Sequence, residues 1–196
     1  ARDGTLWVAS LGAGALRLEP GSSGRAALVT RRHGLPNETI WAVEEDREGN
    51  LWVGHNAGLS RLRPGYRAHT WFTAGRGSGA GAVLPEPTVF AVLPPSRDAS
   101  NALMWVGTGG GLAAVLTGDG QSTWLGTGAG LLSASVYALA RDPGGQVWVG
   151  TLEGLNRLSP GAVGPVGERV VTNEGIWTLT GERVGTVYGC FPLDLP

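Results

Sequence analysis

Two interlocked series of aromatic residues constrain the fold of this chain more than any other feature. A tryptophan inside a short apolar tetrad recurs at Leu6–Ala9, Leu51–Gly54, Met104–Gly107 and Val147–Gly150, with steps of 45, 53 and 43 residues. A second tetrad, with an aromatic residue at its second position, recurs at Ile40–Val43, Val89–Val92, Val136–Leu139 and Ile176–Leu179. A period of this length indicates a repeat architecture, in which each repeat is one supersecondary unit.

The two series keep a nearly fixed distance from each other. Trp41 precedes Trp52 by 11 residues, and Tyr137 precedes Trp148 by 11. The interval between Phe90 and Trp105 is wider because of an insertion around residues 94–98. Each tetrad is bounded by glycine and aspartate, which is typical of a short strand buried on both faces. Between the two tetrads, residues 46–50 and 142–146 fit a type I turn closed by a left-handed glycine.

Two further strands complete each repeat. The third strand is predicted at residues 59–62 and 155–158, after turns at 55–58, 108–111 and 151–154, and a weaker fourth strand at residues 68–72. Four consecutive antiparallel strands per repeat are the signature of a β-propeller blade. The sequence therefore predicts an all-β chain without helices, a single partial propeller domain over residues 1–196 with about four blades' worth of repeats. The expected blades are 1–33 (partial), 34–80, 81–130, 131–172 and 173–196 (partial).

The repeat phase bears on whether these blades form a closed ring. The chain opens on a second strand, and Tyr188 lies 11 residues after Trp177, so a second strand is expected at residues 186–188 of a fifth copy. This phase favours an open array from a larger propeller over a closed four-bladed ring.

The eight tryptophans fit this architecture. A large flat side chain on the second strand can fill the wedge between adjacent sheets. We therefore interpret all the repeated aromatic residues as structural rather than as ligand-stacking groups.

Composition excludes several kinds of partner. The formal net charge is -1 and charged residues make up 16%, so there is no electrostatic case for nucleic acid or an anionic membrane surface. Cys190 is the only cysteine, which excludes an internal disulfide and a thiolate metal site. No metal site, no cofactor and no membrane contact are expected within this segment.

The turns that lead into the first strand and those between the second and third strands should share one face, around the central channel. That face is the candidate ligand-binding face because its side chains are the more varied in polarity. Its members are Arg31, Arg32, His33, Asn37, Glu38, His55, Asn56, Glu153, Asn173 and Glu174. Asn37 also fits an Asx-turn within its own loop, and Asp46 and Asp142 fit turn capping.

The titratable residues do not converge on a catalytic pattern. The three histidines fall on different elements, and the glycine-rich stretch at residues 107–111 aligns with the turn after the second strand rather than with a phosphate loop. A propeller lyase is the enzyme alternative, with His33 and Glu38 as its best pair. A passive interaction or dimerisation scaffold is a third possibility.

The motif string also carries a family resemblance. Residues 34–37, 40–46, 49–54 and 58–62 closely resemble the two-component regulator propeller repeat, and Thr151, Gly154, Leu155 and Arg157 fit the same pattern. The resemblance implies a bacterial periplasmic or otherwise extracytoplasmic sensor module for signal transduction. It implies that the ligand is a carbohydrate, which is an oligosaccharide in several members of the family, or another small molecule. It also implies that neighbouring blades or domains of the parent chain are the partners.

Overall fold

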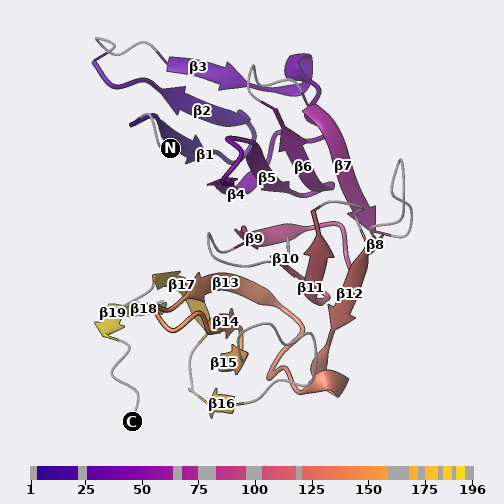
Figure 1. Cartoon of the computed structure of the whole chain (residues 1–196), viewed down its shortest axis with the longest axis vertical. Helices are drawn as coiled ribbons and strands as arrows, with labels where there is room; N and C mark the ends of the chain where they lie inside the picture. The colour runs from indigo at the N-terminus through magenta and orange to yellow at the C-terminus, as the bar shows by residue number, and fades with distance from the viewer. Residues whose placement is uncertain are drawn as a thin grey trace.

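A computed structural model of the chain describes residues 4–21, 26–63, 68–74, 83–95, 103–117, 121–158, 168–171, 175–180, 183–186 and 189–192. Its strands form five sheets that follow one another around an arc, with the first and the fifth sheet at the two ends (Figure 1). Within each sheet, strands consecutive in sequence pair antiparallel, apart from one parallel pair in the second sheet.

The sheets follow the sequence order. The first contains β1 (Leu6–Ala9), β2 (Ala15–Leu18) and β3 (Ala26–Val29). The second contains β4 (Ile40–Glu45), β5 (Leu51–His55), β6 (Gly58–Leu62), β7 (Ala68–Ala74) and β8 (Val83–Leu84). The third contains β9 (Val89–Leu93), β10 (Leu103–Thr108), β11 (Gly111–Leu116) and β12 (Ser122–Leu125). The fourth contains β13 (Val136–Arg141), β14 (Val147–Thr151), β15 (Gly154–Leu158) and β16 (Glu168–Val171). The fifth contains β17 (Ile176–Thr180), β18 (Arg183–Thr186) and β19 (Gly189–Pro192).

The predicted all-β propeller fold is confirmed. The first strands of the repeats, β4, β9, β13 and β17, pack side by side along the inner edge of the arc, and the later strands of each sheet lie progressively outward (Figure 1). The expectation of no helix was wrong in detail. Two 3-10 turns, η1 (Arg31–His33) and η2 (Thr127–Ala129), precede β4 and β13, and each ends at a glycine followed by a buried leucine.

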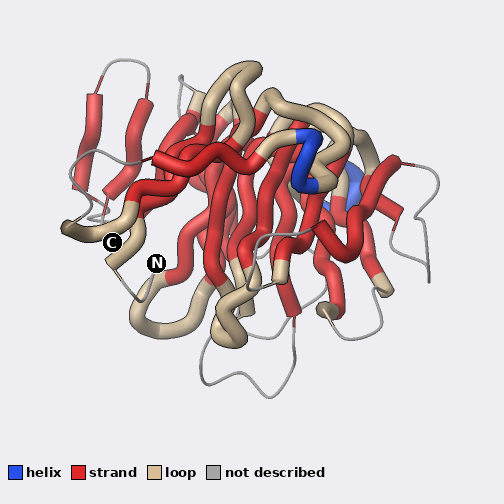
Figure 2. The backbone as a smooth tube through the Cα atoms, turned by 90° about the horizontal axis from the view of Figure 1, so that it is seen from above, coloured by secondary structure: helices blue, strands red, loops and turns tan. Residues whose placement is uncertain are grey.

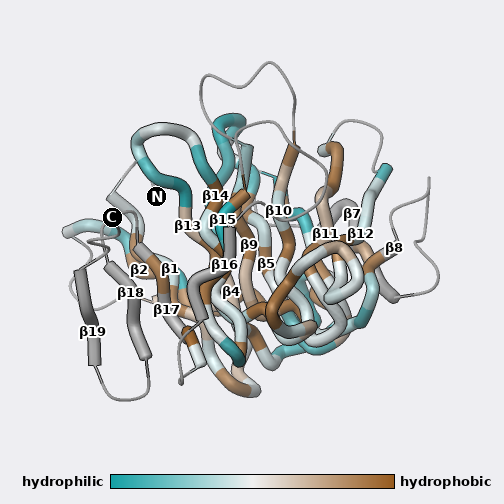
Figure 3. Tube along the Cα trace, turned by 90° about the horizontal axis from the view of Figure 1, so that it is seen from below, coloured by the Kyte–Doolittle hydropathy of each residue, from teal (hydrophilic) through white to brown (hydrophobic). Residues whose placement is uncertain are grey.

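Loops gather at the two ends of the strands. Figure 2 shows the strands running between these two loop faces, with both 3-10 turns near the same face. Apolar stretches lie along the strands, and the loops above them in the view of Figure 3 are hydrophilic. The turns after the second strands and the loops into the first strands share one face, because Leu152 N donates to Ser135 O at 3.2 Å. The hairpins between first and second strands therefore lie on the opposite face.

An aspartate closes two of those hairpins, and Asp46 is buried whereas Asp142 is half-buried. Asp46 accepts hydrogen bonds from the backbone N–H groups of Glu48 and Asn50, and its other carboxylate oxygen accepts from Trp52 Nε1 at 2.8 Å. Asp142 makes the same bond to Trp148 Nε1 at 3.1 Å. The interpretation of both aspartates as turn-capping residues is confirmed, and each also orients the tryptophan of the following strand.

The tryptophans of the second strands fill the wedges between sheets, as predicted. Trp52 is fully buried in a cluster that includes Met104 and Val106 of the next sheet, and Trp105 packs with Val147 and Val149 of the sheet after that. Within the same sheet, the guanidinium of the cross-strand neighbour Arg61 lies 5.4 Å from the ring centre of Trp52, and Arg157 repeats this contact over Trp148 at 5.5 Å.

A glycine two residues after each buried tryptophan lets the next sheet approach. A Cβ on Gly54 would lie 2.7 Å from Val89 Cγ1, and a Cβ on Gly107 would lie 2.7 Å from Val136 Cγ1 and 2.9 Å from the Val136 carbonyl oxygen. Gly150 meets Ile176 in the same way, at 2.6 Å. The Trp-Val-Gly pattern of the second strand is therefore a packing requirement of the interface between neighbouring blades.

The fifth sheet corrects one prediction. Ile176 pairs with Thr186 and Thr178 with Gly185, the register in which Val136 pairs with Thr151 and Ala138 with Gly150. The second strand is therefore β18, and not residues 186–188 as the 11-residue spacing suggested, because the hairpin between β17 and β18 is shorter than its counterparts. A third strand, β19, also pairs with β18, so this copy does not end at its second strand.

The close approach at Gly107 predicts a stability defect. Gly107→Ala should lower the free energy of unfolding by about 1–3 kcal/mol, because the added methyl meets backbone as well as side-chain atoms of Val136. Gly128→Ala is the matched control, since nothing lies within 4 Å of a Cβ there. Denaturant unfolding of both variants measures the effect, and equal stability would contradict this account of the motif.

Candidate functional site

A β-bulge interrupts the first strand of four sheets at the same register. In β4 the pairing passes from Ile40 with His55 to Ala42 with Gly54, which leaves Trp41 outside the ladder. The same shift leaves out Phe90 in β9, Tyr137 in β13 and Trp177 in β17. Because a bulge redirects the side chain of its extra residue, each first strand presents an aromatic residue near its beginning.

Three of these aromatic rings contact each other across the blades. Trp41 meets Phe90 edge-on, with ring centres 5.4 Å apart and planes at 75°, and Phe90 meets Tyr137 at 4.8 Å and 43°. Such pairs each contribute about 0.5–1.5 kcal/mol beyond area burial. We call Trp41, Phe90 and Tyr137 the aromatic row. The side chain of Trp177 lies outside the described residues.

The aromatic row differs from the buried tryptophans in its exposure. The side chains of Phe90 and Tyr137 are partly exposed, and Trp41 is 42% exposed, whereas Trp52, Trp105 and Trp148 are buried. The expectation that these strands are buried on both faces was therefore wrong at Trp41, whereas the interpretation of the first-strand aromatic residues as structural rather than ligand-stacking groups stays a prediction. The bulge is the reason, because it places these residues outside the regular alternation of the strand.

Asn56 links the aromatic row to the predicted polar face. Its Oδ1 accepts a hydrogen bond from Trp41 Nε1 at 2.6 Å, which fixes the orientation of the indole. Asn56 is exposed in the turn between β5 and β6, and Glu153 is exposed in the corresponding turn between β14 and β15. Asn173 and Glu174 lie outside the described residues.

The remaining predicted residues belong to the loop before β4. Asn37 Oδ1 accepts from Thr39 N at 2.7 Å, which confirms the Asx-turn interpretation. Glu38 Oε1 accepts from Arg31 N at 3.0 Å, and His33 Nδ1 accepts from Thr30 N at 3.1 Å. The pair proposed for a lyase, His33 and Glu38, is thus bound to the backbone of its own loop.

The exposed residues Arg31, Arg32 and His33 form η1, which directly follows the outer strand β3. Figure 1 shows this turn at the outer edge of the arc near the start of β7, whereas β4 lies at the inner edge. The predicted face therefore divides into an outer basic loop and an inner part, where Asn56 meets the aromatic row.

His55 does not lie on this surface. It is the last residue of β5 and fully buried, so the prediction that it faces a ligand was wrong. Its Nδ1 accepts from Ala57 N at 3.1 Å, as the hydroxyl oxygens of Thr108 and Thr151 accept from backbone N–H groups in their turns. Because Nδ1 is an acceptor, Nε2 carries the proton and donates to Ser60 Oγ at 2.8 Å.

The described residues include no group of three or more histidine, cysteine, aspartate or glutamate side chains that could hold a metal ion. No helix within them is long and apolar enough to cross a membrane.

Two segments of the chain, residues 34–57 and 130–153, match the family model of the two-component regulator propeller. Both begin at the glycine that ends a 3-10 turn and run through the first and second strands to the turn after them. A search of curated protein sequences found no match.

Solved structures with a similar fold include two extracellular domains from B. thetaiotaomicron. The domain of a putative one-component system is 24% identical with a TM-score of 0.71, over 96% of this chain and 26% of that one. The domain of a putative hybrid two-component system is 15% identical with a TM-score of 0.71, over 97% and 26%. This chain therefore spans about a quarter of their length.

Virginiamycin B lyase from Staphylococcus aureus is also similar, at 12% identity and a TM-score of 0.65, over 100% of this chain and 69% of the lyase. At these identities the structural similarities establish the propeller fold and nothing more about activity.

The buried His55 predicts a pH-dependent stability. Burial lowers the pKa of His55 to about 4 from its ordinary value of 6.5. The unfolded chain therefore binds more protons between these pH values, so the stability contribution is complete above pH 6.5 and is lost as the pH falls toward 4.

The variant His55→Thr carries the residue that two sister repeats have at this position, and it should remove the dependence of unfolding free energy on pH. Between pH 6.5 and 4 the wild type should lose up to about 3 kcal/mol more unfolding free energy than the variant. Urea unfolding at several pH values measures the difference, and above pH 7 the two curves should run parallel. Parallel curves throughout would show that His55 is not held neutral by the fold.

Proposed function

We propose, from the premise that the chain is built of two-component regulator propeller repeats, that it is a ligand-binding sensor module of a bacterial signalling protein. The two segments that match the repeat family support this proposal. The similar solved structures are extracellular domains of putative one-component and hybrid two-component systems, which supports an extracytoplasmic location for this module as well.

The observation that carries a binding role is the aromatic row. Four bulges at one register are not needed for strand pairing, and each places an aromatic residue at the beginning of an inner strand. Binding sites typically combine aromatic surface with a few polar groups that fix orientation. Asn56 beside Trp41, and Glu153 in the corresponding turn of the fourth sheet, supply such groups on the same face.

An oligosaccharide suits this surface. A pyranose ring has an apolar C–H face that packs on an aromatic side chain, while its hydroxyl groups bond to amide and carboxylate oxygens. A row of rings that crosses three blades can contact successive sugar units in a way that a single ring cannot. The lyase alternative gains less support, because His33 and Glu38 hold the backbone of a loop at the outer edge of the arc.

A panel of oligosaccharides tests the proposal through thermal stabilisation. A ligand that binds only the native state at 100 times its dissociation constant adds about 2.7 kcal/mol to the unfolding free energy. Trp41→Leu should weaken binding at least about tenfold, since it removes the exposed ring and its bond to Asn56.

Trp124→Leu is the matched control. Trp124 is 56% exposed but lies on the outer strand β12, where its Nε1 donates to Gly110 O at 3.1 Å. Its loss should leave affinity unchanged. Equal affinities of wild type and Trp41→Leu would exclude the aromatic row as the site, and the absence of any stabilising oligosaccharide would count against the ligand class.

A further inference from the structure

The turn after each second strand lies beside the ring that its own sheet contributes to the aromatic row. In the second sheet the first turn residue is Asn56, whose side chain holds the indole of Trp41. In the third sheet the first turn residue is Gly109, and the first and second strands pair in the same register as in the second sheet. The backbone of Gly109 is therefore placed relative to Phe90 as that of Asn56 is relative to its indole.

A glutamate from the loop before β9 fills the place of the missing side chain at Gly109. A Cβ on Gly109 would overlap with Oε2 of Glu86, and a Cβ on Gly110 would lie 3.2 Å from the Cβ of Glu86. This explains two of the glycines in residues 107–111, because a side chain at either turn residue would crowd the glutamate. The third sheet thus has a carboxylate where the second sheet has the amide of Asn56.

The carboxylate of Glu86 has no partner among the residues that the structure describes. No hydrogen bond or ion pair engages it there, and the side chain is partly buried. In the loop before β4, by contrast, Glu38 accepts from the backbone N–H group of Arg31. A charge-assisted hydrogen bond is about twice as strong as a neutral one, so the carboxylate of Glu86 favours a cationic group over a hydroxyl group.

The inner part of this face has carboxylates but no cation among the side chains that the structure describes. Glu153 is exposed in the corresponding turn of the fourth sheet. The sequence contains no lysine, and Arg31 and Arg32 lie in η1 at the outer edge of the arc. The other described arginine side chains belong to the sheets or to the opposite face: Arg17, Arg47, Arg61, Arg63, Arg141 and Arg157. The surface around the aromatic row is therefore acidic.

We propose that the ligand of the aromatic row carries a protonated amine that pairs with the carboxylate of Glu86. Within the proposed function, on which this inference rests, the ligand class is an oligosaccharide of amino sugars with free amino groups. An ammonium group is attracted both to an aromatic ring and to a carboxylate, and this surface offers the two together. Sugars that carry carboxylate or sulfate groups are disfavoured, because Glu86 and Glu153 repel them.

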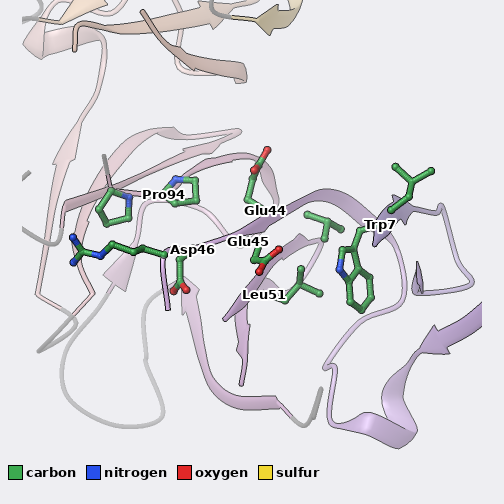
Figure 4. Close-up of a pocket in the computed structure, with 10 residues that line it drawn as sticks. Trp7, Glu44, Glu45, Asp46, Leu51 and Pro94 are labelled. Atoms are coloured by element: carbon green, nitrogen blue, oxygen red, sulfur yellow. The ribbon is translucent and has the colours of Figure 1, made fainter. Parts of the chain in front are cut away.

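A hollow at the other end of β4 serves as the comparison surface, because it also combines a ring with carboxylates. Its volume is about 460 Å³, and Trp7, Glu44 and Glu45 line it (Figure 4). Asp46 and Leu51, which flank the hairpin between β4 and β5, line it as well, so it lies on the face opposite the aromatic row. Glu44→Gln therefore removes a charge near an aromatic ring without changing the aromatic row.

Calorimetric titration with two trisaccharides tests the proposal. At about pH 6.5 the β-1,4-linked trimer of glucosamine carries protonated amines, whereas the trimer of N-acetylglucosamine has the same backbone without charge. The glucosamine trimer should bind the wild type at least about tenfold more tightly than the acetylated trimer. Glu86→Gln keeps the shape of the side chain and should reduce this affinity ratio at least about fivefold. Glu44→Gln should leave the ratio unchanged.

Four results would overturn the proposal: no binding of either trimer, equal affinities of the wild type for both, a ratio that survives Glu86→Gln, or a ratio that Glu44→Gln also removes. Trp41→Leu separates this outcome from the fate of the aromatic row. If the acetylated trimer binds the wild type and Trp41→Leu weakens it, the row is the site even where the amine brings no gain. If the glucosamine trimer depends on Glu86 but not on Trp41, the proposed function fails at the row, and this inference fails with it.

Discussion

The whole array depends on how two neighbouring sheets can touch along one strand. Trp52 and Gly54 lie two residues apart, and both contact the next sheet, one through Met104 and Val106 and the other through Val89. The indole holds the sheets apart at one point, while the absent Cβ lets them meet at the other. Val53, between them, packs in the cluster on the opposite side. One tripeptide therefore sets the contact between successive blades.

The polar contacts around the tryptophan between two sheets hold its indole in place, and they do not form a ligand-binding site. Asp46 accepts from Trp52 Nε1 while Arg61 lies over the ring, and Asp142 and Arg157 do the same at Trp148. These contacts satisfy a buried N–H group that would otherwise cost free energy. The residues of each repeat that lie outside the contact between sheets are available to bind a ligand. They are those at the beginning and the end of the first strand.

Sequence reasoning succeeded where one residue has one structural consequence, as in the Trp-Val-Gly spacing and the aspartate-capped hairpins. It failed where backbone irregularity intervened. The exposure of Trp41 follows from a bulge, which a strictly alternating strand does not predict, and β18 was misplaced because its hairpin is short. His55 was assigned to the surface as a polar turn residue, whereas the structure buries it, like the aligned Thr108 and Thr151, whose hydroxyl groups donate to backbone carbonyl oxygens within their turns. The blade boundaries stay predictions.

The aromatic row and the wedge use different parts of the same inner strand. The bulge in β4 sets Trp41 outside the ladder, where its indole contacts Phe90 and its Nε1 donates to Asn56 Oδ1. Val43, two residues later, packs with Trp7 and Val53 in the contact between the first two sheets. Because Trp41 lies outside that cluster, the ring at the bulge can change without disturbing the contact between those sheets. The repeat thereby separates the residues that make the fold from those that can bind a ligand.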